Sequence, residues 1–428
     1  MNSCIVENSK LSGSIVVPSS KSQTLRAILF AAMAKGKSSI YQYLPSPDTE
    51  AMVQACAHFG AKLSMGTEKI DVEGINGKIG RLEDVIYAGN SGIVLRFCTA
   101  LAAVGKYPCV VTGDYSIRHH RPMKALLEGL AQFGVRTESM RGDGYAPVII
   151  QGPIQSGKIR LQGEDSQPVS ALLIAAAFSE GPLEIEVHNP GERPWVFLTL
   201  DWFDRLGIVY EQTADFIFRL PGKSSYDGFT YRVPGDCSAA AFPIAAALIT
   251  QSEITIHNID MQDKQGDKRI VELFQEMGAS IHIDLQKKSL KVKRGEQLRG
   301  ISIDINDCID AITILAVMGC FAKGKTHIRN GAIAKQKECN RIYCIAKELR
   351  KMGAIISETE DGLLIEESSL SGAKVHSHED HRMAMSLIVA AMGAKGASEI
   401  SSVNCMAKTF PSFMGEFIKL GAIIDYTQ

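Results

Sequence analysis

The sequence predicts an α/β protein of two domains, in which similar repeated units place helices inside and strands outside. Three observations lead to this prediction: the length of the chain, a glycine-ended motif that occurs six times, and an apolar helix expected before each motif. With 428 residues, the chain is longer than one hydrophobic core usually supports. Its 45% hydrophobic and 22% charged residues are typical of globular proteins.

The first repeated element is an amphipathic helix that ends in glycine and passes into a short apolar strand. In "MKALLEGLAQFG" (123–134) the apolar residues follow helical spacing, and glycine suits the left-handed turn that ends a helix. The motif recurs every 68 to 75 residues, with its glycines at Gly60, Gly134, Gly207, Gly278, Gly353 and Gly421. This regular spacing predicts six structural repeats.

The second repeated element is an Ala-rich helix followed by a turn and a strand. Two of the six copies are "RAILFAAMAKGKSSI" (26–40) and "ALLIAAAFSEGPLEIEV" (171–187). Helices that are apolar on nearly all sides belong in an interior. Each repeat should therefore supply one central helix and one amphipathic helix, covered by strands with an alternating pattern.

Two features divide the six repeats into three and three. "VVPSSKS" (16–22) is echoed by "RVPGDCS" (232–238), three repeat lengths later, and the last repeat stops seven residues after its glycine. We therefore expect the first eighteen residues to complete the last sheet. The predicted domains are 1–18 with 235–428 (repeats 4–6) and 19–234 (repeats 1–3), with the active site in the cleft between them.

Charge and cysteine usage narrow the possible partners and compartment. The net charge of −1 provides no global field for nucleic acid or a membrane, so an anion site would need a local cluster of cations. The start of the chain lacks an apolar signal core, and no apolar run is long enough to span a bilayer. Ten scattered cysteines without metal-type spacing favour the reducing cytoplasm and no metal site.

Cations recur where helices are expected to begin, and such positions suit anions because of the helix dipole. In "PSSKSQTLRA", Lys21 and Ser22 stand at a helix start and Arg26 shares the face of Ser22. "KQKECNRI" should place Lys337, Glu338 and Arg341 within about one helical turn. A solvated helix start is the alternative for any one of these positions, but recurrence in several repeats favours an anion site.

Seven blocks resemble, in order, the signature blocks of the 5-enolpyruvylshikimate-3-phosphate (EPSP) synthase family: "PSSKSQTLRA", "GNSGIVLR", "HRPMKAL", "IDAITILA", "KECNR", "DHRMAM" and "AKTFPSF". The resemblance runs from about residue 11 to residue 415. It implies a two-domain inside-out α/β barrel of six βαβαββ repeats, three per domain. It also implies enolpyruvyl transfer from phosphoenolpyruvate to the 5-hydroxyl of shikimate 3-phosphate, with release of phosphate, in aromatic amino-acid biosynthesis. No cofactor and no metal are implied, and the family is usually monomeric.

The resemblance assigns roles to particular residues, and both substrates are anions whose mutual repulsion cations must offset. The residues that it implies for phosphoenolpyruvate binding are Lys21, Gly92, Arg121, Gln167, Arg341, Arg382 and Lys408. Those implied for shikimate 3-phosphate are Ser22, Arg26, Ser166, Gln167, Asp310 and Lys337. Asp310, Glu338 and Lys21 are implied in catalysis, through a tetrahedral intermediate formed by addition and resolved by elimination. Asp310 would take the hydroxyl proton and Glu338 would donate one to the methylene carbon, with a structural salt bridge as the alternative for Glu338.

Several positions depart from the family pattern, mostly on the acceptor side. Asp165 replaces a serine near the expected 3-phosphate, so it should turn away or be neutralised by a cation such as Arg193. The other departures are Arg193-Pro194-Trp195 for Lys-Pro-Tyr, Ile333 and Asn340 for Asn and Asp, and Ile93 for Thr. The bulkier Ile93 predicts weak binding of glyphosate, the family's inhibitor.

Two alternatives remain open at this point. A related transferase of the same architecture acts on UDP-N-acetylglucosamine, but it carries Lys-Asn near its start and a loop cysteine. Here Ser22 follows Lys21, and "DYSIRHHRP" (114–122) has no cysteine. An inactive scaffold of the same fold is the other alternative, against which the retained set of Lys21, Asp310, Glu338, Arg341 and Lys408 argues.

Overall fold

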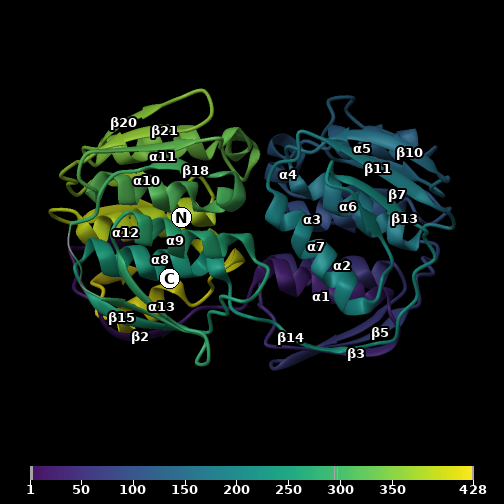
Figure 1. The fold of residues 1–428 in the computed structure, drawn as a ribbon, viewed down its shortest axis with the longest axis horizontal. Coiled ribbons are helices and arrows are strands. Elements are labelled where there is room, and N and C mark those ends of the chain that lie inside the picture. The colour runs from purple at the N-terminus through teal and green to yellow at the C-terminus, as the bar shows by residue number, and fades with distance from the viewer. Residues whose placement is uncertain (1–2, 294, 296, 427–428) are drawn as a thin grey trace. The chain divides into compact units, whose positions relative to one another are not determined.

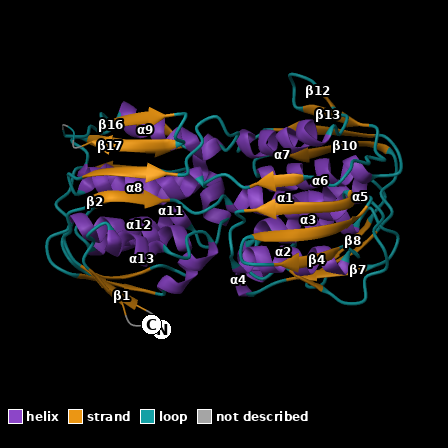
Figure 2. Cartoon of the chain, turned by 90° about the horizontal axis from the view of Figure 1, so that it is seen from below, coloured by secondary structure: helices purple, strands orange, loops and turns teal. Residues whose placement is uncertain are grey.

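The computed structural model describes residues 3–293, 295 and 297–426. The chain divides into two compact units, each with its own hydrophobic core. Unit 1 consists of Met1–Ser19 and Pro234–Gln428, and unit 2 of Ser20–Val233. Both are built in the same way, with helices enclosed by strands (Figures 1 and 2).

The six apolar helices predicted from the Ala-rich segments form the cores of the two units. They are α1 (Lys21–Met33), α3 (Gly92–Ala102) and α6 (Ser166–Phe178) in unit 2, and α8 (Cys237–Ile249), α10 (Ile312–Phe321) and α12 (His381–Gly393) in unit 1. Nearly every residue of these helices is buried, because small alanine side chains let the helices pack closely. The Ala-rich composition of these segments therefore explains why their helices lie at the centre of each unit.

Among the described residues, six four-stranded sheets surround these helices, three in each unit. In every sheet one pair of strands is parallel and the remaining pairs are antiparallel. The sheets of unit 2 contain β14 (Thr230–Arg232), β3 (Lys35–Tyr41), β5 (Lys69–Ile75) and β4 (Lys62–Met65); β6 (Ile86–Tyr87), β7 (Cys109–Thr112), β9 (Val148–Gln151) and β8 (Arg136–Ser139); and β10 (Gly157–Gln162), β11 (Leu183–His188), β13 (Ile217–Leu220) and β12 (Glu211–Gln212).

The sheets of unit 1 follow the same order of parallel and antiparallel neighbours. They contain β2 (Ser12–Val16), β15 (Glu253–His257), β17 (Ser289–Lys293) and β16 (Ser280–Asp284); β18 (Ser302–Asp304), β19 (Lys325–Arg329), β21 (Leu363–Glu366) and β20 (Ile355–Glu358); and β22 (Lys374–His376), β23 (Ser398–Ser401), β1 (Ser3–Val6) and β24 (Ile424–Tyr426). Strand β1 lies between β23 and β24 in the last sheet, as the sequence predicts, but β2 pairs with β15 in another sheet, so only part of the first eighteen residues joins the last sheet.

The six motif glycines end the second helix of each repeat. These helices are α2 (Pro47–His58), α5 (Lys124–Gln132), α7 (Arg193–Leu206), α9 (Arg269–Glu276), α11 (Arg341–Lys351) and α13 (Phe413–Lys419). All six glycines have positive φ, between +67° and +108°. The chain then enters β4, β8, β12, β16, β20 or β24, which confirms the six predicted repeats.

Short helical segments connect the main elements and carry several of the predicted site residues. They are α4 (Tyr115–His120), η1 (Gly266–Lys268), η2 (Asn306–Ala311), η3 (Ala332–Gln336) and η4 (Val403–Lys408). Within the described residues, no helix combines the length and the apolar character that crossing a membrane requires.

Candidate functional site

In unit 1, Arg341 lies at the centre of a buried group of charged side chains. It is the first residue of α11 and is 1% exposed. Its Nη1 donates to Asp310 Oδ1 at 2.6 Å, its Nη2 to Glu338 Oε2 at 2.7 Å, and its Nε to Asp380 Oδ2 at 2.7 Å. One guanidinium therefore holds three carboxylates that lie far apart in the sequence.

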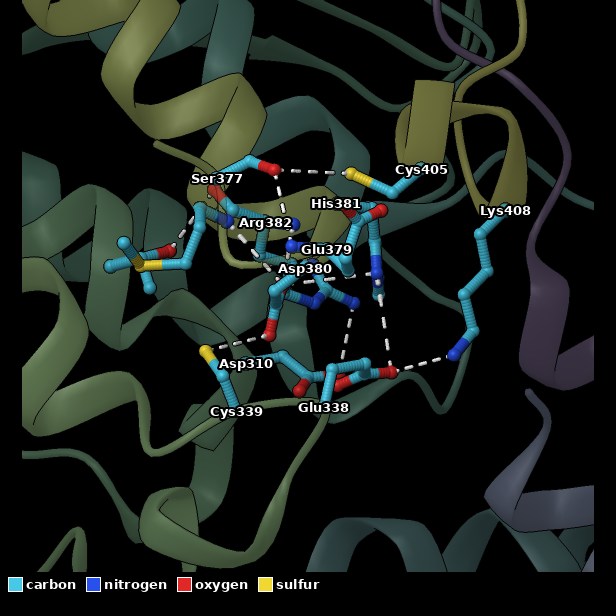
Figure 3. Close-up of polar contacts among 12 residues, drawn as sticks. Asp310, Glu338, Cys339, Ser377, Glu379, Asp380, His381, Arg382, Cys405 and Lys408 are labelled. Atoms are coloured by element: carbon cyan, nitrogen blue, oxygen red, sulfur yellow. Dashed lines mark hydrogen bonds and ion pairs between the residues drawn. The ribbon is translucent and has the colours of Figure 1, made fainter. Parts of the chain in front are cut away.

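Two further cations complete this group. Arg382, near the start of α12, donates from Nη2 to Asp310 Oδ2 and to Ser238 Oγ, both at 2.9 Å. Lys408, at the end of η4, donates to Glu338 Oε1 at 2.7 Å. Figure 3 shows these side chains converging from separate segments. Asp310 and Glu338 are thus each held between two cations.

The electrostatic surroundings of the two central groups follow from this geometry. Burial alone would raise the pKa of Asp310, but the positive charges of Arg382, Arg341 and Lys337 outweigh burial and hold this pKa well below its ordinary value of 3.8. Burial would lower the pKa of Arg341, but its three carboxylate partners raise it well above the ordinary value. Asp310 therefore carries its negative charge near neutral pH.

Asp380 is the carboxylate that the sequence prediction missed. It is fully buried and caps α12 by accepting from the backbone N–H groups of Arg382 and Met383. It also pairs with Arg341, and Cys339 Sγ lies 3.8 Å from its Oδ2 (Figure 3). The only signal in the sequence is its place directly before a helix start, where aspartate is a common cap.

Lys337 and Glu338 lie outside the helix that the sequence predicts for them. Asn340 caps α11 by accepting from Tyr343 N–H at 3.2 Å, so the helix begins only at Arg341. Lys337 and Glu338 precede this cap and are 7% exposed each. The expectation of one shared helical turn was wrong, because the cap ends the helix before it reaches them. The contact between Glu338 and Arg341 forms nevertheless.

Three neighbouring side chains have atoms of the type that bind metals. One ligand atom from each of Glu338, Asp380 and His381 lies within 4.8 Å of the other two. Both carboxylates already pair with protein cations, Glu338 with Lys408 and both with Arg341. The positive charge that a metal ion would supply is therefore already provided by side chains.

In unit 2, a second group surrounds the start of α3. Arg96 donates from Nη1 to Gln167 Oε1 at 2.7 Å and from Nη2 to Pro122 O at 3.0 Å. A Cβ at Gly92 would lie 3.0 Å from Arg96 Nη1, 3.1 Å from Gln167 Oε1 and 3.8 Å from Arg121 Cζ. The structure therefore brings together Gly92, Arg121 and Gln167, which the sequence assigns to one substrate.

Arg96 is a second residue that the sequence prediction missed, although it stands in the block "GNSGIVLR". It is 1% exposed, and its Nη2 lies 3.3 Å from Asp165 Oδ2. Burial lowers the pKa of Arg96, while the negative charge of Asp165 opposes this shift. Arg96, rather than the expected Arg193, neutralises Asp165. Arg193 instead lies over the ring of Phe216, 5.4 Å from its centroid.

Lys21 and Arg26 belong to α1, which Ser20 caps. Lys21 Nζ lies 3.4 Å from Asp48 Oδ2. Arg26 is 2% exposed, and its Nε and Nη2 donate to Thr199 Oγ1 at 3.1 and 3.0 Å. Its Nη1 donates to the carbonyl of Ser22 at 3.3 Å.

Arg26 differs from Arg96, Arg341 and Arg382 because, among the described residues, it forms no ion pair with a carboxylate. Burial lowers the pKa of Arg26 to about 9. Desolvation without a compensating anion explains this shift. A carboxylate placed against this side chain would favour its charged form.

Most of the remaining departures from the family pattern have structural roles. Ile93 packs against the core of unit 2, and Ile333 against the core of unit 1. Asn340 supplies the cap of α11, as an aspartate could. Trp195 is partly buried, and its carbonyl accepts from Arg26 Nη2 at 3.3 Å.

Comparisons with known proteins agree with this architecture. A solved EPSP synthase from Acinetobacter baumannii superposes with a TM-score of 0.84 and 25% identity over the full length of both chains. A 3-phosphoshikimate 1-carboxyvinyltransferase from Chlamydia pneumoniae is 44% identical over 411 residues, covering 96% of this chain and 91% of the relative. One from Acetivibrio thermocellus is 40% identical, covering 98% of each chain.

The family model described as EPSP synthase (3-phosphoshikimate 1-carboxyvinyltransferase) matches residues 5–417. This match reaches into all six repeats and includes both groups of charged side chains. The fold class that the sequence predicts is confirmed, and the match extends over nearly the whole chain. The chain therefore belongs to the EPSP synthase family.

Proposed function

We propose that the charged groups around Arg341 and around Gln167 bind the substrates of this family's reaction. The chain is a transferase that moves the enolpyruvyl group of phosphoenolpyruvate to the 5-hydroxyl of shikimate 3-phosphate and releases phosphate, a step of aromatic amino-acid biosynthesis. The assignment of individual residues below is the proposal.

Each unit supplies residues that we assign to phosphoenolpyruvate. Unit 1 supplies three buried cations that already share two carboxylates: Arg341, Arg382 and Lys408. Unit 2 supplies Lys21, Gly92, Arg121 and Gln167. The absence of a Cβ at Gly92 lets Gln167 and the two neighbouring guanidinium groups approach the backbone closely. Arginine forks suit the phosphate and the carboxylate of this substrate.

The acceptor is bound mainly by unit 2, with help from Asp310 and Lys337. Arg26 receives the acceptor's carboxylate beside Ser22, which compensates the desolvation of the guanidinium. Ser166 and Gln167, at the start of α6, face the phosphate end. Asp310 accepts a hydrogen bond from the 5-hydroxyl and positions its oxygen for attack.

In the addition step, the 5-hydroxyl oxygen attacks C2 of phosphoenolpyruvate while Glu338 protonates the methylene carbon C3. The hydroxyl proton passes to Asp310, and a tetrahedral intermediate forms. In the elimination step, the bond between C2 and the phosphate oxygen breaks, Glu338 takes a proton back from C3, and phosphate leaves with the proton held by Asp310. Lys408, whose Nζ lies 2.7 Å from Glu338 Oε1, stabilises the carboxylate that forms between the two steps.

One observation carries this proposal: Glu338 and Asp310 lie within one buried group and are each held between two cations. A carboxylate that must lose and regain a proton needs neighbours that stabilise its charge without moving. A scaffold protein would have no use for three buried cations, because pairing buried charges gains little stability over apolar packing.

The test is phosphate release from phosphoenolpyruvate with three acceptor conditions: shikimate 3-phosphate, UDP-N-acetylglucosamine and none. We expect release only with shikimate 3-phosphate. Lys408→Met should lower kcat at least about a hundredfold. Lys419→Met, whose side chain is 73% exposed, is the matched control and should retain full activity. Release with neither acceptor would favour the scaffold.

We further propose that the enzyme is a monomer, as is usual for the family, and that it acts in the reducing cytoplasm, as its scattered cysteines favour. Size-exclusion chromatography with light scattering should give the mass of one chain, 46.5 kDa. A dimer mass that persists on dilution would contradict this.

A further inference from the structure

Two cysteines lie together at the start of α11, next to the charged group around Arg341. Asn340 caps this helix, so Cys339 directly precedes the cap and Cys344 is the fourth residue of the helix. Side chains at these two positions commonly pack against each other across the first turn. Here the two thiols are hydrogen-bonded to each other, and both residues are buried, with 8% and 6% of their surface exposed. The cap of α11 therefore brings the two sulfur atoms together.

A histidine and a glutamate complete the surroundings of Cys344. The thiol is hydrogen-bonded to His378, whose Nε2 lies 2.9 Å from Glu348 Oε1. Glu348 is one turn further along α11, and its other oxygen accepts from Lys351 Nζ at 2.6 Å, so its position is fixed. A thiol beside an imidazole that a carboxylate orients is an arrangement that activates cysteine as a nucleophile.

These contacts make the two thiols chemically different. The hydrogen bond with Cys339 lowers the pKa of Cys344, burial opposes this shift, and the hydrogen bond with His378 lowers the pKa further. The same bond between the cysteines, burial and the charge of Asp380 raise the pKa of Cys339. All ten cysteines lie in the part of the chain that the structure describes, and burial raises the pKa of the other eight. Cys344 is therefore the thiol with thiolate character, and its neighbour is protonated.

The pair is directly connected to the proposed catalytic group. Cys339 follows Glu338 in the chain, and its Sγ lies 3.8 Å from Asp380 Oδ2, which also accepts from Arg341 Nε (Figure 3). A disulfide bond is about 2.05 Å long, so two hydrogen-bonded sulfur atoms must move closer to form one. Because Glu338 is bonded to Cys339 through the peptide, this movement changes the position of Glu338.

We propose that Cys344 and Cys339 form an oxidation site at which a hydroperoxide produces a disulfide that switches the enzyme off. The Cys344 thiolate attacks one oxygen of hydrogen peroxide: an S–O bond forms, the O–O bond breaks, and the hydroxide released takes up the proton that the thiol has lost and leaves as water. Cys339 then attacks the sulfenic sulfur: the S–S bond forms, the S–O bond breaks, and a second water leaves with the proton of Cys339. The two thiols lose two electrons, which the peroxide gains.

The effect on activity rests on the proposed role of Glu338 as proton donor, whereas the oxidation itself does not. Disulfides of proteins in a reducing compartment are usually transient and serve redox sensing. Reduction by a thiol should therefore restore Glu338 to its place and recover the activity.

The test treats reduced wild-type enzyme with hydrogen peroxide, blocks the remaining thiols with iodoacetamide and digests the chain with trypsin. Cleavage after Lys337, Arg341 and Lys347 places the two cysteines on separate peptides, 338–341 and 342–347, which only a disulfide can join. Mass spectrometry should find these peptides joined. Phosphate release from phosphoenolpyruvate with shikimate 3-phosphate should fall at least about tenfold, and dithiothreitol should restore it.

Three variants separate the steps. Cys339→Ser should form no disulfide and should accumulate the sulfenic acid of Cys344, which dimedone traps. Cys344→Ser should give neither product and should keep its activity in peroxide. Cys405→Ser is the matched control, because it removes a partly buried cysteine of the same unit whose pKa burial raises to about 12. This control should form the disulfide and lose activity as the wild type does.

The proposal is overturned if peroxide-treated wild type yields no joined peptides, or if the peptides are joined and activity is unchanged. Loss of activity in Cys344→Ser at the wild-type rate also overturns it. The peptide analysis of the wild type decides even if a variant does not fold. Failure of the proposed function looks different, because reduced wild type would then release no phosphate with shikimate 3-phosphate, while the disulfide would still form.

Discussion

Two buried arginines, one in each unit, lie in opposite surroundings. Arg341 in unit 1 contacts three carboxylates, whereas Arg26 in unit 2 contacts a hydroxyl and two carbonyl groups. Accordingly, the pKa of Arg341 lies above its ordinary value, and burial lowers the pKa of Arg26 to about 9. Arg341 is therefore buried with carboxylate counter-ions, whereas Arg26 is buried without one.

This difference separates two ways of preparing a site for anions. In unit 1, Arg341, Arg382 and Lys408 already contact carboxylates of the chain before a ligand binds. Their charges are therefore fixed in position, but each cation gains less from binding a ligand anion. The Arg26 side chain stays electrostatically unsatisfied, so a ligand carboxylate gains more by binding it. We expect the first arrangement to serve catalysis and the second to serve affinity.

The largest effect should follow from Arg341→Met. The substitution leaves Asp310, Glu338 and Asp380 close together without their shared cation, and breaking a buried ion pair typically costs about 3–5 kcal/mol. Urea unfolding should report this loss of stability. Arg350→Met on the same helix, with a side chain 43% exposed, should cost less than about 1 kcal/mol. Equal losses for the two variants would refute the view that the network is ionically coupled.

Arg26→Met should have the opposite effect, because it should change acceptor affinity much more than stability. Thr199 Oγ1 already donates to Trp195 O at 3.3 Å, so both keep a partner, and methionine can still pack against the ring of Phe97. Stability should therefore change by less than about 1 kcal/mol, while affinity for the acceptor falls about a hundredfold. Denaturation and calorimetry measure the two quantities.

The control for this variant is Arg205→Met, whose side chain is 44% exposed in the same unit. It should leave acceptor affinity unchanged. A large loss of stability in Arg26→Met, with unchanged affinity, would show that this arginine is structural and would remove the contrast between the units.

Asp310→Asn tests the ionic network through pH. The folded-state pKa of Asp310 lies below its unfolded value, so its charge contributes stability above about pH 3.8, and this contribution is lost as pH falls further. The wild type should be more stable than the variant by about 2 kcal/mol at pH 7, and this advantage should shrink below pH 4 by about 1.4 kcal/mol per pH unit. Urea titrations between pH 7 and pH 3 measure it. An advantage independent of pH would mean that the asparagine acts through packing instead of charge.

The elements that the sequence predicted well are those with local causes. The six glycines end helices because glycine readily adopts a left-handed φ. The Ala-rich helices are central because they are apolar on nearly all sides and are therefore buried. The cations of the signature blocks Arg341, Arg382 and Lys408 do lie together. Their roles in binding stay predictions.

The elements that the sequence missed depend on which segments face each other. Arg96 neutralises Asp165 because α3 packs against α6, whereas the sequence offers Arg193 as a partner. Asp380 joins the network through a helix cap far along the chain from Arg341. Glu192 accepts a hydrogen bond from Ser166, and its own backbone is left-handed. Neither composition nor spacing reveals this conformation.

The smallest effects should come from the motif glycines, where the two units ought to behave alike. Gly207 in unit 2 has φ +67° and Gly278 in unit 1 has φ +102°, and a Cβ at either would meet nothing within 4 Å. Replacement by alanine then costs only the backbone conformation, about 1 kcal/mol for Gly207→Ala, which stays near the allowed left-handed region. Gly278→Ala should cost more, because +102° lies outside that region. Thermal unfolding of both variants shows which one loses more stability. The loss should depend on φ and not on the unit, because the two units differ in their buried charges and share the same repeat.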